Sequence, residues 1–456
     1  MSQKKWIGFP DKFLWGVGSS AHQIEGYNSN SDWWLYEEQP GKIKKGEKSG
    51  AACDHWNRVE EDTQLLKDAG AQVYRFGVEW AKIQPTEDSW DESVILHYKN
   101  ELDLLLKAGI IPMITLQHFS IPLWLAHQGG WAAEGAPEKF LKFSKRIYEE
   151  LGSKVEYWIT INEPMVVLVL GYLSGHGPPG SGGLGMMIEA MDGMIRGHAL
   201  VYHECKKMSK ELGWINPQIG IAHHLRVFQP KRKWNLLDWI TAHGISRAFN
   251  WSFFDAVETG NLFFKVPRHV NVKRQLANAK GTQDFIGINY YSRDHVQFGF
   301  KHPFWFHVSF RQDRPLTDLG WEIYPRGIYK LIKQSSKRAT PGKPIWITEN
   351  GVADRYDSKR ESFIKQHLFW LSRAIKKGLP VVGYIHWTIY DNFEWSEGYD
   401  PKFGLYENDF KTQVRTPRKS AITFKQIIQD NGFELDDNKL AAILGVKQPS
   451  LKSPTE

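Results

Sequence analysis

The chain has 456 residues, a formal net charge of +7, and 41% hydrophobic and 14% aromatic residues. This composition excludes an intrinsically disordered protein and is sufficient for a large hydrophobic core. The basic residues are spread along the sequence, with only brief clusters at 42–48 and 231–233. We therefore interpret the charge as an ordinary solvated surface and expect no nucleic-acid partner.

Cysteine usage and apolar runs set expectations about the compartment. The only two cysteines, Cys53 and Cys205, stand in unrelated contexts, so no disulfide framework is indicated. No apolar stretch of signal-peptide length follows Lys4 and Lys5, and no apolar run is long enough to span a bilayer. We expect a soluble, cytoplasmic protein that has no membrane partner.

Short apolar runs rich in β-branched and aromatic residues recur along the chain and predict strands. Amphipathic segments lie between most of them, such as 59–70 and 97–109, where apolar residues recur every three or four positions and a glycine ends the pattern. The predicted strands are 13–18, 73–78, 112–117, 156–161, 219–223, 284–290, 344–348 and 381–387.

Eight apolar strands that alternate with helices predict an α/β fold, a closed (β/α)8 TIM barrel with elaborated loops at its C-terminal face. An open doubly wound sheet is the alternative, but the glycines after the first strand lack the GxGxxG spacing. No linker divides the chain, so we predict a single barrel domain over residues 1–435. The remainder, 436–456, is predicted to be a partly disordered C-terminal extension.

Active sites of such barrels lie at the carboxyl ends of the strands, and the predicted ends collect polar and aromatic side chains. Their number makes one shared site more plausible than a set of unrelated structural residues. They are Arg75, Gln117, His118, Asn162, Glu163, His223, His224, Asn289, Tyr290, Tyr291, Glu349, Asn350, His386 and Trp387.

Glu163 and Glu349 end two of these strands and form a pair of carboxylates, which is the equipment that cleaves a glycosidic bond. We expect apolar neighbours to keep Glu163 neutral, so that it serves as the acid. We expect Arg75 and a tyrosine hydroxyl to keep Glu349 ionised, so that it serves as the nucleophile. The outcome at the anomeric carbon depends on the separation of the carboxylates, so the residues alone leave retention and inversion open.

Seven ordered motifs place these residues in a wider pattern. The chain contains FLWGVGSSAHQIEG, YRFGVEW, TINEP, GINYY, GWEIYPRG, ITENG and DNFEW, and over about residues 8–432 it resembles glycoside hydrolase family 1. The resemblance implies a (β/α)8 barrel, a covalent glycosyl-enzyme intermediate and no cofactor. It also implies that Glu163 is the acid/base and that Glu349 is the nucleophile.

The resemblance assigns further residues to the sugar site. It implies that Arg75, Asn289 and Tyr291 support the nucleophile, and that Tyr291 rather than Tyr290 lies in the site. Met165 and Trp321 are expected on the aglycone side. The residues expected to bind the sugar are Gln23, His118, Asn162, Glu394 and Trp395, together with Trp387 as the aromatic floor and Tyr291 beside it.

Departures from the family pattern narrow the class of sugar that we expect the site to bind. Members that act on 6-phosphorylated sugars resemble one another in carrying a serine, a lysine and a tyrosine where this chain has Glu394, Pro401 and Phe403. A carboxylate repels a sugar phosphate, so we expect an unphosphorylated glycone. We expect a β-glucosidase with β-galactosidase or β-fucosidase side activity, and a small β-glycoside or short oligosaccharide as its partner.

Two other classes of protein remain to be weighed. A metal-dependent barrel hydrolase commonly carries His-x-His on its first strand, which is absent from 13–18, so no metal is expected. A sugar-binding protein without activity is expected to have lost one of the two glutamates, and both are present. The aromatic loop 299–320 either lines the site mouth or packs on the barrel.

Overall fold

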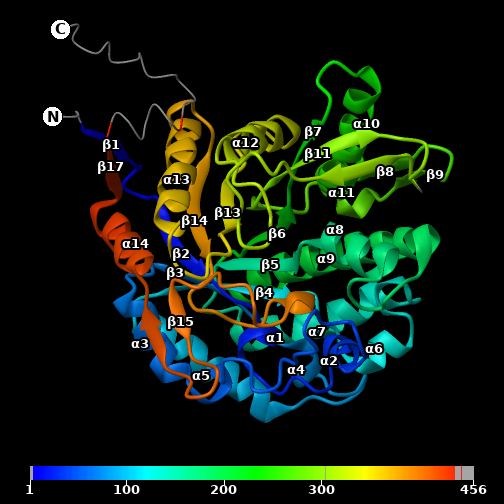
Figure 1. Cartoon of the computed structure of the whole chain (residues 1–456). Coiled ribbons are helices and arrows are strands. Elements are labelled where there is room, and N and C mark those ends of the chain that lie inside the picture. Colours follow the sequence, from blue (N-terminus) through cyan, green and yellow to red (C-terminus); the bar gives the residue numbers. More distant parts are fainter. Residues whose placement is uncertain (1–3, 303, 437–442, 444–456) are drawn as a thin grey trace, which may run out of the picture.

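Eight parallel strands close into a barrel in this computed structural model, which describes residues 4–302, 304–436 and 443 (Figure 1). Each predicted strand is present within two residues at either end, so the predicted barrel is confirmed and the open sheet is wrong. In order around the barrel, the strands are β2 (Leu14–Gly18), β3 (Val73–Gly77), β4 (Ile111–Gln117), β5 (Tyr157–Asn162), β6 (Gln218–His224), β10 (Phe285–Asn289), β13 (Ile345–Asn350) and β14 (Val381–Trp387), which pairs with β2.

Side chains fill the interior of the barrel. One compact cluster contains a residue from each of seven strands and is almost fully buried. Such a layer makes the barrel a packed core rather than a pore, and it leaves the strand ends as the place for a site. The cluster consists of Val73, Met113, Ile159, Ala222, Phe285, Trp346 and Ile385.

A ring of helices covers the barrel and buries its apolar faces against the strands (Figure 1). Gly70 and Gly109 adopt positive φ directly after the first two helices of the ring, as the amphipathic segments predicted. The covering helices are α3 (Val59–Asp68), α5 (Glu92–Lys107), α7 (Ala136–Leu151), α9 (Gly183–Leu212), α11 (Ser252–Thr259), α12 (Arg326–Arg338), α13 (Arg360–Lys376) and α14 (Lys419–Asp430).

Shorter helices occupy the connections. A π-helical segment, η3 (Val167–Ser174), follows the short helix after Glu163, and a second, η4 (Arg247–Trp251), precedes α11. The others are α1 (Ala21–Ile24), α2 (Asp32–Glu37), η1 (His55–Asn57), α4 (Trp80–Ile83), α6 (Leu123–His127), η2 (Gly130–Ala132), α8 (Pro164–Val166), α10 (Leu236–Ser246), η5 (Ala277–Ala279) and η6 (Trp395–Glu397).

Four small sheets lie outside the barrel in the described part of the chain. The aromatic loop 299–320 contributes β12 (Phe306–Ser309) to a sheet with β11 (Arg293–Phe298) and β7 (Val227–Pro230). Part of this loop is therefore ordered as sheet, an outcome that neither alternative for the loop anticipated. The remaining pairs are β8 (Asn261–Val266) with β9 (Val270–Gln275), β15 (Tyr406–Asn408) with β16 (Arg415–Pro417), and β1 (Lys4–Gly8) with β17 (Gly432–Asp436).

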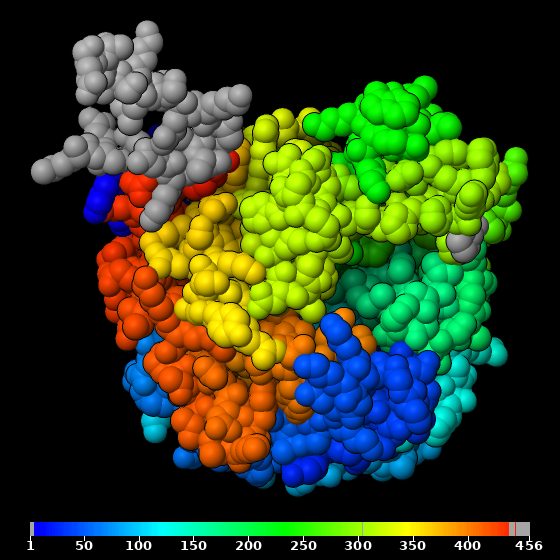
Figure 2. Space-filling view, in the orientation of Figure 1, coloured from blue at the N-terminus to red at the C-terminus, as the bar shows by residue number. Residues whose placement is uncertain are grey.

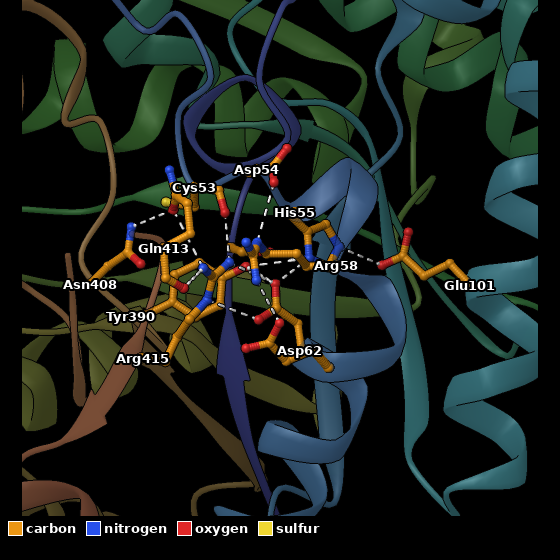
Figure 3. A network of polar contacts seen from close by, with 12 residues as sticks. Cys53, Asp54, His55, Arg58, Asp62, Glu101, Tyr390, Asn408, Gln413 and Arg415 are labelled. Atoms are coloured by element: carbon orange, nitrogen blue, oxygen red, sulfur yellow. Dashed lines mark hydrogen bonds and ion pairs between the residues drawn. The ribbon is translucent and has the colours of Figure 1, made fainter. Parts of the chain in front are cut away.

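A buried network of charges joins the C-terminal hairpin β15–β16 to the start of the barrel (Figure 3). His55 Nδ1 lies 2.8 Å from Asp62 Oδ2 and its Nε2 lies 3.2 Å from Glu101 Oε1. Arg415 Nε donates to Asp62 Oδ1 at 3.1 Å and Tyr390 donates to Asp62 Oδ2 at 3.0 Å. Burial opposes the charge on His55, but both carboxylates outweigh it and raise the pKa of His55 to about 10.

The predicted C-terminal extension, 436–456, lies almost entirely outside the described residues. Ile443 is described, and it packs against the main hydrophobic cluster. The domain boundary after residue 435 stays a prediction. Among the described residues, no helix is both long enough and apolar enough to cross a membrane.

Candidate active site

Glu163 stands directly after β5 in an unusual backbone conformation. Its φ of 47° is left-handed, which a residue with a Cβ adopts only where its surroundings enforce it. Its backbone N donates to Ala222 O of β6 at 2.8 Å, and the pairing of β5 with β6 shifts register just before it. Such irregularities at strand ends reorient side chains, and the Glu163 carboxyl is buried.

Glu349 lies in β13 next to a second register shift. Asn289 of β10 is its register partner, and the pairing of β13 with β14 shifts between Ile347 and Asn350. The side chain of Glu349 is buried. Both glutamates therefore end barrel strands at positions where the ladder is interrupted, which is the arrangement expected of functional side chains.

Arg75 connects the surroundings of the two glutamates. Its fully buried guanidinium donates from Nη1 to Glu349 Oε1 at 2.5 Å and from Nη2 to Asn162 Oδ1 at 2.6 Å. Asn289 Nδ2 donates to the same Asn162 oxygen at 3.0 Å and to Glu163 Oε1 at 2.9 Å. The structure thus brings together five residues from β3, β5, β10 and β13 that the sequence had placed in one site.

The two adjacent tyrosines after β10 have different partners. Tyr291 donates its hydroxyl to Glu349 Oε2 at 2.6 Å, whereas Tyr290 donates to the backbone oxygen of Tyr324 at 2.6 Å. Burial raises the pKa of Tyr291 well above its usual value, so its hydroxyl keeps the proton that it donates. One carboxylate oxygen of Glu349 therefore accepts a hydrogen bond from Arg75, and the other accepts one from Tyr291.

The pKa values of the two carboxyls differ from those that the sequence led us to expect. Burial, together with the charge of Glu163, raises the pKa of Glu349 to about 7 against the opposing effect of Arg75. Arg75 cannot lose its own proton, and Glu349 is the only carboxylate that it contacts in the described part of the chain. A neutral Glu349 would leave a buried cation without a counter-charge, so Arg75 favours the ionised form.

The expected apolar surroundings of Glu163 are wrong. Its Oε1 lies 2.8 Å from His224 Nδ1 and also accepts the bond from Asn289. Burial pushes the pKa of Glu163 upward, but the charge and hydrogen bond of a protonated His224 outweigh it and lower that pKa. The sequence had placed His224 at a strand end without giving it a role; its position on β6, next to β5, was the available signal.

Asn162 fixes the protonation of His118. Because Asn162 Oδ1 faces the donors of Arg75 and Asn289, its Nδ2 must face His118 Nε2, which lies 3.0 Å away. Nε2 therefore accepts and the proton sits on Nδ1. Burial lowers the pKa of His118 well below its usual value, so the ring is neutral. Among the described residues Nδ1 has no partner, which leaves a buried donor free for a ligand hydroxyl.

Glu394 offers the matching free acceptor. Burial raises the pKa of its carboxyl to about 8. Its Oε1 has no hydrogen-bond partner in the part of the chain that the structure describes. Gln23 itself is fixed, because its Nε2 donates to Asn392 Oδ1 at 2.9 Å and to Phe393 O at 2.8 Å.

Aromatic rings enclose the same region. The His118 ring stacks at 5.7 Å against Trp387 and at 6.0 Å against Trp395. Trp387, Tyr291 and Phe403 belong to a small apolar cluster, and Trp321 packs against it. Trp321 therefore borders the site, with its ring 5.9 Å from that of Tyr291, and its role on the aglycone side stays a prediction.

Met165 is the other residue expected on the aglycone side, and that role stays a prediction. It is buried in the main hydrophobic cluster, directly after Glu163 and Pro164. Its side chain therefore packs against other apolar residues of that cluster. Within the described residues, no three His, Cys, Asp or Glu side chains converge as ligands for a metal ion.

A (β/α)8 barrel with two buried glutamates at the ends of β5 and β13, joined through an arginine and two asparagines, defines the class of glycoside hydrolases. The model of the family described as glycosyl hydrolase family 1 matches residues 5–433. The chain belongs to glycosyl hydrolase family 1.

Individual relatives span nearly the whole chain. Beta-glucosidase A of Thermotoga maritima is 33% identical over 450 residues, covering 93% of this chain and 99% of that protein. The beta-galactosidase of Pyrococcus woesei is 30% identical, covering 93% and 98% of the two chains. A beta-glucosidase from Thermotoga maritima in complex with glucoimidazole superposes with a TM-score of 0.87 at 31% identity, covering 94% and 100%.

Proposed function

We propose that the chain is a retaining β-glucosidase that releases terminal, unphosphorylated β-D-glucosyl residues by double displacement, with β-galactosides and β-fucosides as side substrates. The observation that carries the proposal is the hydrogen bonding of Glu349, whose two carboxylate oxygens accept from Arg75 Nη1 and Tyr291 Oη. Glu163 belongs to the same hydrogen-bond network. A carboxylate fixed in this way is preorganised to face an anomeric carbon.

In the first displacement, the Glu349 carboxylate attacks the anomeric carbon, and the bond from that carbon to the leaving oxygen breaks. Glu163 delivers its proton to this oxygen, so the aglycone leaves as a neutral alcohol. The product is a glycosyl ester on Glu349 and a carboxylate at Glu163. In the second displacement, Glu163 takes a proton from water as that water attacks the anomeric carbon, and the Glu349 ester bond breaks.

The mutual repulsion of the two carboxylates supports this alternation of roles. The charge of Glu163 raises the pKa of Glu349, and the same repulsion acts on Glu163 while Glu349 is ionised. Esterification removes the charge of Glu349, so the pKa of Glu163 falls and its carboxylate is ready to act as a base. His224, when protonated, lowers the pKa of Glu163, which favours the base of the second displacement and opposes the acid of the first.

The free donor and acceptor of the site support a glycone with unmodified hydroxyls. His118 Nδ1 can donate to one hydroxyl, and Glu394 Oε1 can accept from another. A phosphorylated sugar is disfavoured because neither Glu394 nor Phe403 supplies a positive charge for a phosphate. Phe403 is instead buried against Tyr291 and Trp321. Trp387 and Trp395 supply flat faces for the apolar side of the ring.

Glucose is proposed as the preferred glycone because relatives named beta-glucosidase match the chain at up to 33% identity, and one related structure holds glucoimidazole. Galactosides remain side substrates because a relative named beta-galactosidase matches at 30%. The partner is accordingly a small β-glycoside or short oligosaccharide. A cytoplasmic location stays a prediction, with which the buried free thiols of Cys53 and Cys205 accord.

Proton NMR of the first product tests the proposal. We expect hydrolysis of an aryl β-glucoside to yield β-glucose first, followed by slow mutarotation, and aryl β-glucosides to be cleaved faster than galactosides, fucosides or 6-phosphoglucosides. Initial release of α-glucose would overturn the retaining mechanism. Preference for the 6-phosphoglucoside would overturn the reading of Glu394 and Phe403.

A further inference from the structure

Helix α10 exposes a set of large apolar side chains, which we call the α10 patch. Trp234 is 81% exposed just before the helix, and Leu236 within its first turn is 71% exposed. Phe300, whose segment is bonded to the helix, is 72% exposed. Soluble proteins rarely present apolar groups of this size together without a partner. The α10 patch consists of Trp234, Leu236, Leu237, Trp239, Ile240 and Phe300.

The helix is held to the protein by its polar side, so the outward position of its apolar side is built into the fold. Asp238 is fully buried and accepts from Arg232 Nε at 3.0 Å, from Arg232 Nη2 at 2.6 Å and from Phe298 N at 2.9 Å. Asn235 caps the first turn by accepting from Leu237 N. Asp238 and Ala242 are the buried residues of α10, so its large apolar side chains face outward instead of inward.

Positive charge is concentrated around the patch. The segments 226–249, 260–280 and 294–313 contain twelve Lys and Arg residues and three acidic residues, Asp238, Asp294 and Asp313. This excess exceeds the +7 of the whole chain, so the rest of the molecule is slightly negative. In the sequence, only the brief cluster at 231–233 stood out here, because the other basic residues come from segments that are distant in sequence.

The three segments form one surface. The β7–β11–β12 sheet joins the first and third, and Arg268 in the β8–β9 turn lies 4.3 Å over the Trp305 ring. Figure 1 shows α10 beside the β8–β9 hairpin, and in Figure 2 the same segments, in green shades, form a raised part at the upper right.

Several of these basic side chains are available for a partner. Arg226, Arg232, Arg274 and Arg311 pair with carboxylates. Five other basic residues, all exposed, have no carboxylate within ion-pair distance, as far as the chain is described. These exposed residues are Lys231, Lys233, Lys265, Arg268 and Lys301.

The patch belongs to the catalytic end of the barrel. β7 follows β6, whose last residue is His224, and β11 follows β10 and Tyr291. The connections after β6 and β10 therefore carry both the rim of the site and the α10 patch.

We propose that this face binds the surface of an anionic lipid bilayer, with α10 lying in the plane of the interface. Trp and Leu side chains enter the boundary between headgroups and acyl chains, while flanking lysines and arginines reach the anionic headgroups. A helix that lies on a bilayer needs no membrane-spanning length, so the absence of an apolar run of that length does not bear on it.

Charge and shape favour a lipid bilayer over two other partners, a second copy of the chain and a nucleic acid. A second copy of the chain would bring the same positive excess against itself, and like charges oppose such contact. A nucleic acid gains from flat aromatic platforms along a groove, whereas Leu236, Leu237 and Ile240 are aliphatic and stand on a raised helix.

Flotation of the full chain with vesicles tests the proposal. We expect binding to phosphatidylcholine vesicles that contain phosphatidylglycerol, weak binding to pure phosphatidylcholine, and a loss of binding at high salt. Replacing Trp234→Ser or Trp239→Ser should weaken binding about tenfold each. Lys231→Gln and Lys233→Gln should each weaken it about fivefold and reduce the salt dependence.

A matched pair of variants distinguishes binding through the α10 patch from binding through any exposed apolar residue. Ile240→Ser should weaken binding, whereas Ile422→Ser, which changes an equally exposed isoleucine on α14, should not. Hydrolysis of an aryl glucoside in solution should be unchanged in both, which reports correct folding. Equal binding to neutral and anionic vesicles, or equal effects of the two variants, overturns the proposal. Patch-dependent dimerisation or RNA binding in place of vesicle binding overturns it as well.

Discussion

Replacing the hydroxyl of Tyr291 tests how Glu349 is held. Tyr291→Phe removes one buried hydrogen bond of 2.6 Å to a carboxylate. A hydrogen bond to a charged group contributes about 1.5–3 kcal/mol, and each 1.4 kcal/mol is about tenfold in rate. We therefore expect kcat/KM for an aryl β-glucoside to fall roughly 10- to 150-fold.

The same change alters the pH dependence. The Tyr291 hydroxyl lowers the pKa of Glu349, so its removal raises that pKa further. Because Glu349 must be ionised to attack, the acidic limb of the kcat/KM profile should move to higher pH. A rate loss without this movement would indicate that Tyr291 acts on the substrate instead.

Tyr290 provides a matched control for this experiment. It is the adjacent buried tyrosine and also donates one bond of 2.6 Å, but to the backbone oxygen of Tyr324. Tyr290→Phe should lower the free energy of unfolding by about 1–3 kcal/mol, because a carbonyl loses its partner, and leave kcat/KM nearly unchanged. Equal losses of activity in the two variants would refute the distinction between them.

Two further predictions concern His224 and His55. His224→Asn removes a side chain that lowers the pKa of Glu163, so the basic limb of the kcat/KM profile should move to higher pH; a limb that stays in place would exclude His224 from proton control. The raised pKa of His55 means that its contribution to stability is full below pH about 6.5 and is lost as pH rises through about 10. His55→Gln leaves Asp62 and Glu101 without their shared cation, so it should cost about 3–5 kcal/mol and flatten the fall of the melting temperature over that pH range, as measured by calorimetry. A variant that melts with the wild-type pH dependence would contradict the role of the network.

The barrel was predictable because its signal is local. Each strand is a short apolar run, and each following segment carries a helical period, so residues such as Gly70 and Gly109 marked boundaries without tertiary information. The polar strand ends followed from the parallel topology alone, which is why Arg75 and Asn289 could be placed beside the glutamates.

What the sequence missed depends on which atoms face each other across strands. His224 reaches Glu163 because β6 lies beside β5, and that contact reverses the expected apolar surroundings. The α10 patch was hidden because a run such as residues 234–240 suggests a buried face, whereas the inward residue is Asp238. The charge cluster was hidden because its members come from three separate segments.

The identity of the nucleophile is the central claim, and covalent trapping tests it most directly. A 2-deoxy-2-fluoro glucoside with an activated leaving group should inactivate the enzyme, because the fluorine slows hydrolysis of the ester more than a good leaving group slows its formation. Peptide mapping by mass spectrometry is predicted to find one fluoroglucosyl group on Glu349. A label on Glu163, or turnover of the reagent without any trapped ester, would contradict the account.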